Sequence, residues 1–212
     1  AHNGVLFLDE LPEFDRRARE ALRQPLEIGE ITVTRAGSST TYPSRIMLVA
    51  AMNPCPCGHR GDPRRECRCG PRQVEKYFGR VSGPLLERFD LQVEVPAVPY
   101  GELTGAKGET SAEVRGRVQA ARERQQKRLA GTGCHSNAAM TEKLTRELAE
   151  PDAAGEQLLR HAVERLGFSA RAYSRVLKVA RTIADLAGSE DLKAEHVSEA
   201  IQYRTLDRGA YD

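Results

Sequence analysis

The 212-residue sequence contains no tryptophan, and only 5% of its residues are aromatic. It has no apolar run of about 18 residues and no signal-like hydrophobic region, so we expect neither membrane anchoring nor export and place the chain in the cytoplasm. The formal net charge is only +2, so the bulk charge points to no particular partner and only local patches can. The 29% of charged residues is typical of a soluble, helix-rich protein.

Cysteine is scarce, and four of the five cysteines lie close together as two Cys-x-Cys pairs: Cys55, Cys57, Cys67 and Cys69. Four thiolates at this spacing can close tetrahedrally on Zn²⁺, because the short Gly- and Pro-containing loop between the pairs permits a reversal. Disulfides are the alternative, which a reducing compartment disfavours, and His59 could replace one thiolate. We therefore predict a structural zinc site. The fifth cysteine, Cys134, fits a small apolar or surface position.

The most informative stretch is at the start of the chain. Residues 5–8 form a continuous apolar run, typical of a strand buried on both faces of a parallel sheet, and Asp9 and Glu10 follow it. Ligands of open α/β sheets bind beyond the carboxyl ends of the strands. In this Walker B arrangement Asp9 would hold Mg²⁺ on the phosphates of a nucleotide, and Glu10 would polarise the attacking water. The alternative is an acidic first turn that stabilises the dipole of the next helix.

A second apolar run at residues 45–51 predicts another buried parallel strand, and Asn53 follows its carboxyl end. If the two strands are neighbours, the Asn53 amide lies at the same crevice and can hold the attacking water. Alternatively, Asn53 is only a turn residue before Pro54. Between the strands, helical spacing over 11–22 predicts a helix, and alternation around a Gly-Ser turn over 30–42 predicts an inserted β-hairpin.

Arg88 lies near the end of a predicted short helix at 82–90 and precedes a predicted third strand at 91–95. A guanidinium at this place can reach the phosphates of a neighbouring subunit as an arginine finger. The alternative is an ordinary ion pair with Glu87 or Asp90.

The chain is predicted to be α/β plus all-α. Residues 1–96 form a partial α/β core with a Cys-rich loop at 54–72, residues 97–110 a polar linker, and residues 111–212 a helical lid bundle. Residues 54–82 show little hydrophobic periodicity. The predicted lid helices span residues 111–129, 141–149, 155–166, 170–187 and 193–203.

The helix at 170–187 has a credible N-cap in Ser169 and a credible C-cap in Gly188. Arg171 lies in its first turn, where the side chain could point back toward a nucleotide. Arg175 and Arg181 on the same helix are the alternatives for this role.

The Cys-rich loop and the residues after it are strongly basic, with Arg60, Arg64, Arg65, Arg68, Arg72, Lys76 and Arg80. A metal-pinned loop with several guanidiniums could track a phosphate backbone without reading its sequence. A solvated loop or a contact between subunits explains the charge equally well.

Four stretches, at residues 4–11, 48–58, 82–91 and 169–186, resemble the magnesium-chelatase-related AAA+ ATPases of the ComM/YifB type. The resemblance implies a P-loop NTPase core with a helical lid, in which residues 30–45 match the hairpin before sensor 1. It implies that Asp9 and Glu10 are Walker B, Asn53 is sensor 1, Arg88 is the arginine finger and Arg171 is sensor 2.

The implied cofactors are ATP and Mg²⁺, and the implied assembly is a ring, a hexamer, with ATP at the subunit interfaces. The implied work is DNA remodelling, with branch migration during the recombination of incoming DNA in competence. Two alternatives are the motor subunit of a magnesium chelatase and a non-catalytic, zinc-stabilised module that binds nucleic acid or a partner. The Cys-x-Cys loop argues against the chelatase motor, because chelatase motor subunits lack it.

One departure from the family pattern is large. No Gly-x-x-x-x-Gly-Lys-Ser/Thr sequence occurs, so the Walker A loop that cradles the phosphates is absent. The family carries this loop upstream, and the chain begins at Ala1 directly before a core strand. We therefore expect the C-terminal portion of a longer protein, which by itself binds ATP weakly or not at all and is inactive as an enzyme.

Overall fold

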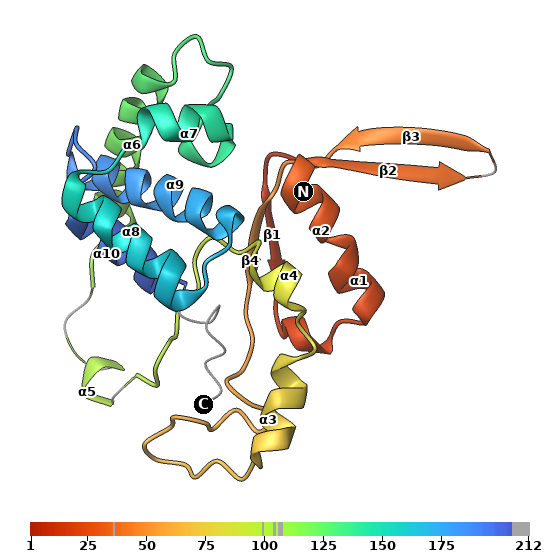
Figure 1. The fold of residues 1–212 in the computed structure, drawn as a ribbon. Coiled ribbons are helices and arrows are strands. Elements are labelled where there is room, and N and C mark those ends of the chain that lie inside the picture. The colour runs from red at the N-terminus through yellow and green to blue at the C-terminus, as the bar shows by residue number, and fades with distance from the viewer. Residues whose placement is uncertain (36, 99, 104, 106–107, 205–212) are drawn as a thin grey trace. The chain divides into compact units, whose positions relative to one another are not determined.

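A computed structural model of the chain describes residues 1–35, 37–98, 100–103, 105 and 108–204 (Figure 1). The described residues fall into two compact units. The first comprises Ala1–Phe89 and Glu94–Ala97, and the second comprises Asp90–Val93 and the described residues from Val98 to Arg204. Residues 205–212, the end of the predicted lid, lie outside the described residues. Within the described part, no helix combines the length and apolar character needed to cross a membrane.

A two-stranded parallel sheet lies in the first unit. Strands β1 (Val5–Leu8) and β4 (Met47–Ala50) pair directly, with Leu8 opposite Ala50. The predicted parallel strands are thus neighbours. The prediction that both strands are buried is wrong. In β1, Val5 and Phe7 are each 60% exposed, and in β4, Met47 and Val49 are 65% and 41% exposed. Side chains alternate between the faces of a strand, and only the face that carries Leu8 and Ala50 packs against the apolar cluster of this unit.

The segment between the strands begins with three short helical pieces: η1 (Leu11–Glu13), α1 (Arg16–Ala21) and α2 (Arg23–Ile28). The predicted single helix at 11–22 is therefore broken. The Asp15 side chain accepts a hydrogen bond from the Ala18 N–H at 2.9 Å and so starts a separate helix, α1.

The predicted β-hairpin is confirmed as the antiparallel pair β2 (Glu30–Arg35) and β3 (Ser38–Pro43), in which every described side chain is exposed (Figure 1). The hydroxyl groups of Thr32 and Thr41 lie opposite each other at 2.9 Å. The strands are thus held by their ladder and by cross-strand pairs of side chains.

Two further helices follow β4. Helix α3 (Pro71–Phe78) was not predicted, although Val74 and Tyr77 are buried on one side of it. Helix α4 (Gly83–Leu86) matches the predicted short helix and buries Leu85 completely in the apolar cluster with Leu11 and Val81.

The predicted third strand at 91–95 is wrong, because these residues form no regular element. Leu91 and Val93 are 51% and 64% exposed, whereas Gln92 is buried and its N–H donates to the Tyr203 carbonyl at 2.8 Å. The apolar residues of the alternating pattern face outward because no described strand pairs with this segment. A short helix, α5 (Tyr100–Leu103), lies in the predicted linker.

The second unit is a helical bundle. It contains α6 (Ser111–Arg128), η2 (Asn137–Ala139), α7 (Glu142–Leu148), α8 (Ala153–Leu166), α9 (Ala170–Ala187) and α10 (Ala194–Gln202). Helix α9 packs against α6, α7 and α10, and its Val176, Ala180 and Ala184 are fully buried. Both predicted caps are confirmed, since Ser169 accepts from the Ala172 N–H at 3.2 Å and Gly188 adopts the left-handed φ of 75°.

Candidate functional site

The carboxyl ends of β1 and β4 meet at one edge of the sheet, because the strands are parallel. The pairing continues one step beyond both strands: the Ala51 N–H donates to the Leu8 carbonyl and the Leu11 N–H donates to the Ala51 carbonyl, each at 2.9 Å. Asp9, Glu10 and Asn53 therefore follow two neighbouring strands at the same edge, and all three are exposed. This is the place where ligands bind in open α/β sheets.

The backbone of Glu10 adopts an unusual conformation at this edge. Its φ of 51° and ψ of 46° lie in the left-handed region, which residues other than glycine rarely occupy. The Asp9 carboxylate accepts a hydrogen bond from the Glu10 N–H at 2.9 Å and so supports the turn. Conformations of this kind cost about 1–3 kcal/mol and cluster at active sites. The turn places the carboxylates of the consecutive residues Asp9 and Glu10 at the edge of the sheet.

The sequence interpretation missed Tyr77, which lies beside these residues. Burial raises the pKa of the Tyr77 hydroxyl, a hydrogen bond with the Asn53 backbone lowers it, and the carboxylates of Glu13 and Glu10 raise it further. The Arg80 guanidinium lies 5.7 Å from the centre of the Tyr77 ring and donates to Glu13 at 2.5 Å. The apolar spacing of Val74 and Tyr77 was the one signal that could have identified α3 and hence this tyrosine.

Arg88 is only 7% exposed. Its guanidinium donates to the Pro84 carbonyl and forms an ion pair with Glu27 of α2, which lies 61 positions earlier in the chain. Sequence proximity had suggested Glu87 or Asp90 as the partner of an ion pair. To reach the phosphates of a neighbouring subunit, the Arg88 side chain has to leave Glu27.

The three arginines proposed for the nucleotide-facing role on α9 lie in different surroundings in the second unit. Arg175 forms an ion pair with Asp90 at 2.5 Å. Arg181 is buried and donates to the carbonyls of Ser189 and Glu190 at 2.6 and 2.7 Å. Arg171 is the exposed one of the three and lies in the first turn of the helix.

The four cysteines predicted as metal ligands come together, and their sulfur atoms all lie within 4.8 Å of one another. The Cys55 Sγ lies 3.4 Å from the Cys57 Sγ and 3.7 Å from the Cys67 Sγ, and Cys57 and Cys67 are also 3.7 Å apart. A tetrahedron with Zn–S bonds of about 2.3 Å has edges of about 3.8 Å, so the spacing fits a zinc ion. All four cysteines are free thiols, and His59 is not part of the cluster.

The surroundings of the thiols also suit a cation. Hydrogen bonds from the backbone of His59 and from Cys55 lower the pKa of the Cys57 thiol to about 6. Burial and the neighbouring Cys57 raise the pKa of the Cys69 thiol to about 12. The Cys57 thiolate therefore forms readily while Cys67 and Cys69 resist ionisation, and a bound dication would offset the repulsion between thiolates.

Metal content provides the test of this cluster. We expect about one zinc per chain, and Cys67→Ser should lower the zinc content severalfold because three thiolates hold the ion more weakly than four. The matched control is Cys134→Ser, since the Cys134 thiol donates to the Ala139 carbonyl in the second unit and lies outside the cluster. Zinc measured by atomic emission that is absent from the wild type, or unchanged in Cys67→Ser, would contradict the assignment.

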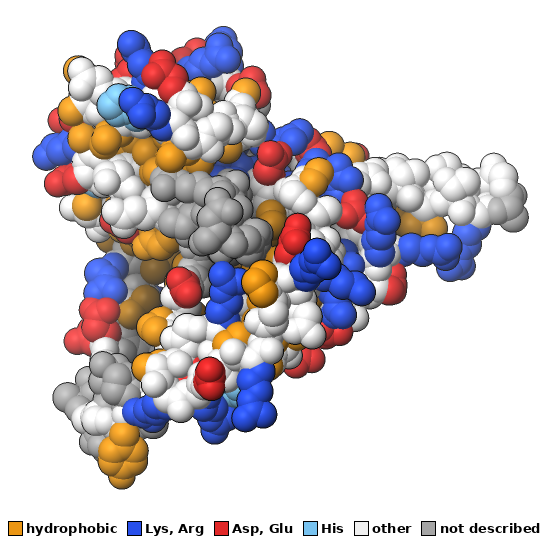
Figure 2. Space-filling model, turned by 60° about the horizontal axis from the view of Figure 1, so that its bottom comes forward, with side chains coloured by type: hydrophobic (Ala, Val, Ile, Leu, Met, Phe, Trp, Pro, Cys, Tyr) orange, Lys and Arg blue, Asp and Glu red, His pale blue; other side chains and the backbone are white. Residues whose placement is uncertain are grey.

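The basic side chains of the loop region are all exposed: Arg60, Arg64, Arg65, Arg68, Arg72, Lys76 and Arg80. Figure 2 shows several Lys and Arg side chains on the lower part of the view, where the loop and α3 lie. Of the seven, Arg80 has an acidic partner in Glu13. The loop and α3 therefore present an exposed surface rich in basic side chains.

Comparisons with known proteins match nearly the whole length of the chain. The family model for magnesium chelatase subunit ChlI matches residues 1–103, and the model for the C-terminal part of ChlI matches residues 108–204. The chain is 48% identical to competence protein ComM of Haemophilus influenzae over 210 residues and 48% identical to the uncharacterized protein YifB of Escherichia coli over 211 residues. Each alignment covers 98% of this chain and 40% of the relative.

A shorter match is to DNA replication licensing factor mcm-6 of Caenorhabditis briggsae, at 34% identity over 91 residues, which is 43% of this chain and 10% of that protein. The chain thus spans about two fifths of the length of the curated relatives that match it end to end. The two family models and the two long matches together show that this chain belongs to the magnesium chelatase ChlI family, in the branch that includes ComM and YifB.

Proposed function

We propose that this chain forms the C-terminal portion of an AAA+ ATPase and contributes the hydrolytic half of its nucleotide site. The observation that carries the proposal is the direct parallel pairing of β1 with β4, which puts Asp9, Glu10 and Asn53 at one sheet edge. Bound Mg²⁺ would neutralise charge on the transferred phosphoryl group. Asp9 would supply a carboxylate ligand to the metal, Glu10 would accept a proton from the attacking water, and the Asn53 amide would orient that water.

In this proposal, the remaining parts of the nucleotide site come from the rest of a full-length protein and from a neighbouring subunit. The relatives are longer than this chain, and we assign the missing Walker A loop to a preceding segment of a full-length protein. The full-length protein would assemble as a hexameric ring. Arg88 would then act on the nucleotide of a neighbouring subunit after release from Glu27, and Arg171 would sense the γ-phosphate from the lid.

We further propose that ATP hydrolysis drives DNA remodelling, including branch migration of recombining DNA. The exposed arginines of the Cys-rich loop support a contact with a phosphate backbone. The names of two relatives, a competence protein and a DNA replication licensing factor, point in the same direction. A chelatase motor is the rival function that the family description favours.

The proposed function is tested by steady-state ATP hydrolysis of the full-length protein with and without DNA. We expect DNA to raise the rate and the stimulation to fall steeply with added salt, because counterion release drives this binding. A rate that rises with a tetrapyrrole and Mg²⁺, and not with DNA, would favour the chelatase motor instead. Absence of hydrolysis under all these conditions would refute the ATPase assignment.

The basic loop gives a separate prediction. The double variant Arg64→Ala/Arg65→Ala should weaken DNA binding for all sequences alike and reduce the slope of log K against log salt by about 2, roughly one per lost phosphate contact. The matched control removes two exposed basic residues of α6, Arg115→Ala/Lys127→Ala, and should leave the slope unchanged. Fluorescence anisotropy across a salt series measures both slopes, and equal losses in the two variants would exclude a specific role of the loop.

A further inference from the structure

We infer that the four-cysteine cluster is a positioning device for Asn53, so that metal occupancy in the Cys-rich loop sets the rate of hydrolysis at the sheet edge. The inference rests on the role proposed above for Asn53. It assigns the metal a task beyond holding the loop together, because the two segments that lie next to Asn53 are both anchored at the cluster.

The first contact lies on the side where the chain enters the loop. The Gly58 N–H donates to the Cys55 carbonyl at 3.0 Å and closes a turn that contains two of the four thiols. Gly58 has a φ of +78°, and a Cβ placed on it would lie 3.9 Å from both Cγ and Oδ1 of Asn53. The turn therefore lies close to the side-chain amide that is proposed to orient the water.

The second contact lies on the side where the chain leaves the loop. Cys69 is followed by Gly70, the N-cap of α3, whose carbonyl accepts from the N–H groups of Gln73 and Val74 at 2.9 and 3.2 Å. Two turns further along this helix lies the buried Tyr77, and the nearby Asn53 backbone lowers the pKa of its hydroxyl. Asn53 thus lies between the entering turn, which is close to its side chain, and the helix that follows the loop, which is close to its backbone.

The cluster joins these two segments. All of residues 54–70 are described, and they form no helix or strand. The sulfur contact of 3.7 Å between Cys55 and Cys67 links the entering turn to the segment that leaves the loop. A metal shared by four thiolates would fix this link, whereas an empty cluster leaves the loop with much more conformational freedom. The amide of Asn53 then loses the surface that holds its orientation.

The experiment is a double-mutant cycle on four full-length proteins. They are the wild type, Cys67→Ser/Cys69→Ser, Asn53→Ala, and the variant that combines all three substitutions. Cysteine variants are preferable to chelators because chelators also remove Mg²⁺. The control is Cys134→Ser. We expect the cysteine double variant to lose zinc, to lower kcat by about 10–100-fold and to leave the affinity for ATP unchanged, because supporting residues act on orientation. In the Asn53→Ala background the cysteine changes should lower kcat no further.

A readout independent of activity is hydrogen–deuterium exchange of the same proteins. We expect faster exchange in peptides covering 53–58 and 71–79 of the cysteine variant, with β1 and β4 unchanged. Multiplicative losses of kcat in both backgrounds, or exchange that rises throughout the first unit, would overturn the inference and leave the metal a purely structural role. If Asn53→Ala alone leaves kcat unchanged, the proposed role of Asn53 fails instead.

Discussion

Replacing Glu10 by Gln is expected to abolish ATP hydrolysis by the full-length protein while ATP binding persists. The amide of glutamine is close to the carboxylate in size but cannot accept the proton of the attacking water, and loss of such a group costs about 10²–10⁴-fold in rate. Asp9 stays in place, so the carboxylate proposed for the metal is retained. Phosphate release measures hydrolysis, and a fluorescent ATP analogue measures binding.

The left-handed backbone of Glu10 makes the choice of substitution important. Gln keeps the side-chain length, so the turn that is supported by Asp9 should persist. The matched control is Glu75→Gln, which changes an exposed carboxylate on α3 and should leave the rate unaltered. Hydrolysis by Glu10→Gln within a factor of about 3 of the wild type would remove Glu10 from the proposed mechanism, since the expected loss is far larger.

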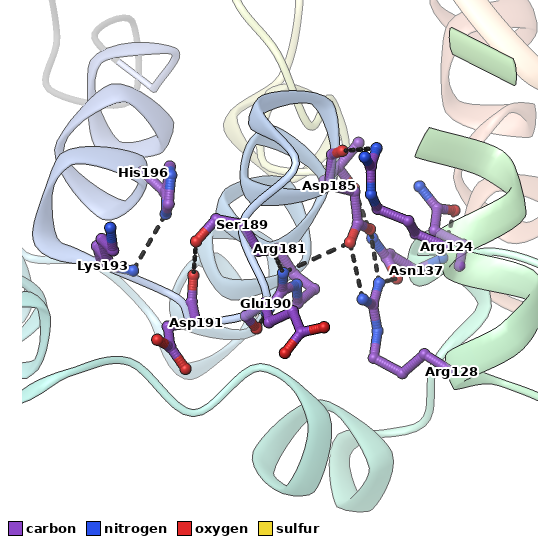
Figure 3. Close-up of polar contacts among 12 residues, drawn as sticks. Arg124, Arg128, Asn137, Arg181, Asp185, Ser189, Glu190, Asp191, Lys193 and His196 are labelled. Atoms are coloured by element: carbon purple, nitrogen blue, oxygen red, sulfur yellow. Dashed lines mark hydrogen bonds and ion pairs between the residues drawn. The ribbon is translucent and has the colours of Figure 1, made fainter. Parts of the chain in front are cut away.

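Replacing Asp185 by Asn should destabilise the helical unit more than any surface change. The Asp185 carboxylate is fully buried on α9 and accepts two hydrogen bonds from Arg128 of α6, at 2.7 and 2.5 Å (Figure 3). Asn137 of η2 donates to it at 2.8 Å, and the Arg181 guanidinium lies 3.5 Å away. One carboxylate therefore ties three elements together and faces two arginines.

The expected cost follows from the charges left behind. The neutral amide of Asp185→Asn would face the buried Arg181 and the largely buried Arg128 without a compensating negative charge, and breaking such a pair costs about 3–5 kcal/mol. Hydrogen exchange of amides in α6 and α9 measures the lost free energy of opening. The control is Glu164→Gln, which neutralises an exposed carboxylate on α8. A loss below about 1 kcal/mol would mean that the network is worth no more than a surface pair.

The sequence alone predicted those parts of the fold that depend on local pattern. Strand β1, the hairpin and helix α9 with its caps Ser169 and Gly188 are each specified by residues within one element, through periodicity, turn residues or side-chain caps. The alternation at 91–95 led to the wrong prediction of a third strand, because a strand also needs a partner strand and no described strand supplies one. Local pattern carries no information about whether a partner is present.

The same distinction between local pattern and distant partners applies to the candidate site. The carboxylate pair and the cysteine cluster were predictable because their members lie a few residues apart, so that spacing encodes geometry. The partner of Arg88 could not be predicted. Glu27 lies 61 positions away in the sequence, and nothing in the sequence distinguishes it from the other acidic residues that could pair with an arginine. Tyr77 was missed because its contact with Asn53 depends on how the Cys-rich loop returns to the sheet.

The central claim is that the sheet edge of one subunit and an arginine of the next form a shared ATPase site. The direct test is ATP hydrolysis by mixtures of two full-length variants, Glu10→Gln and Arg88→Lys, the second of which keeps a positive charge beside Glu27. Each variant alone should be inactive. Mixing should restore hydrolysis, because some interfaces then combine an intact Glu10 with an intact Arg88 from the neighbour. Mixed assemblies that stay as inactive as their components would contradict the shared site.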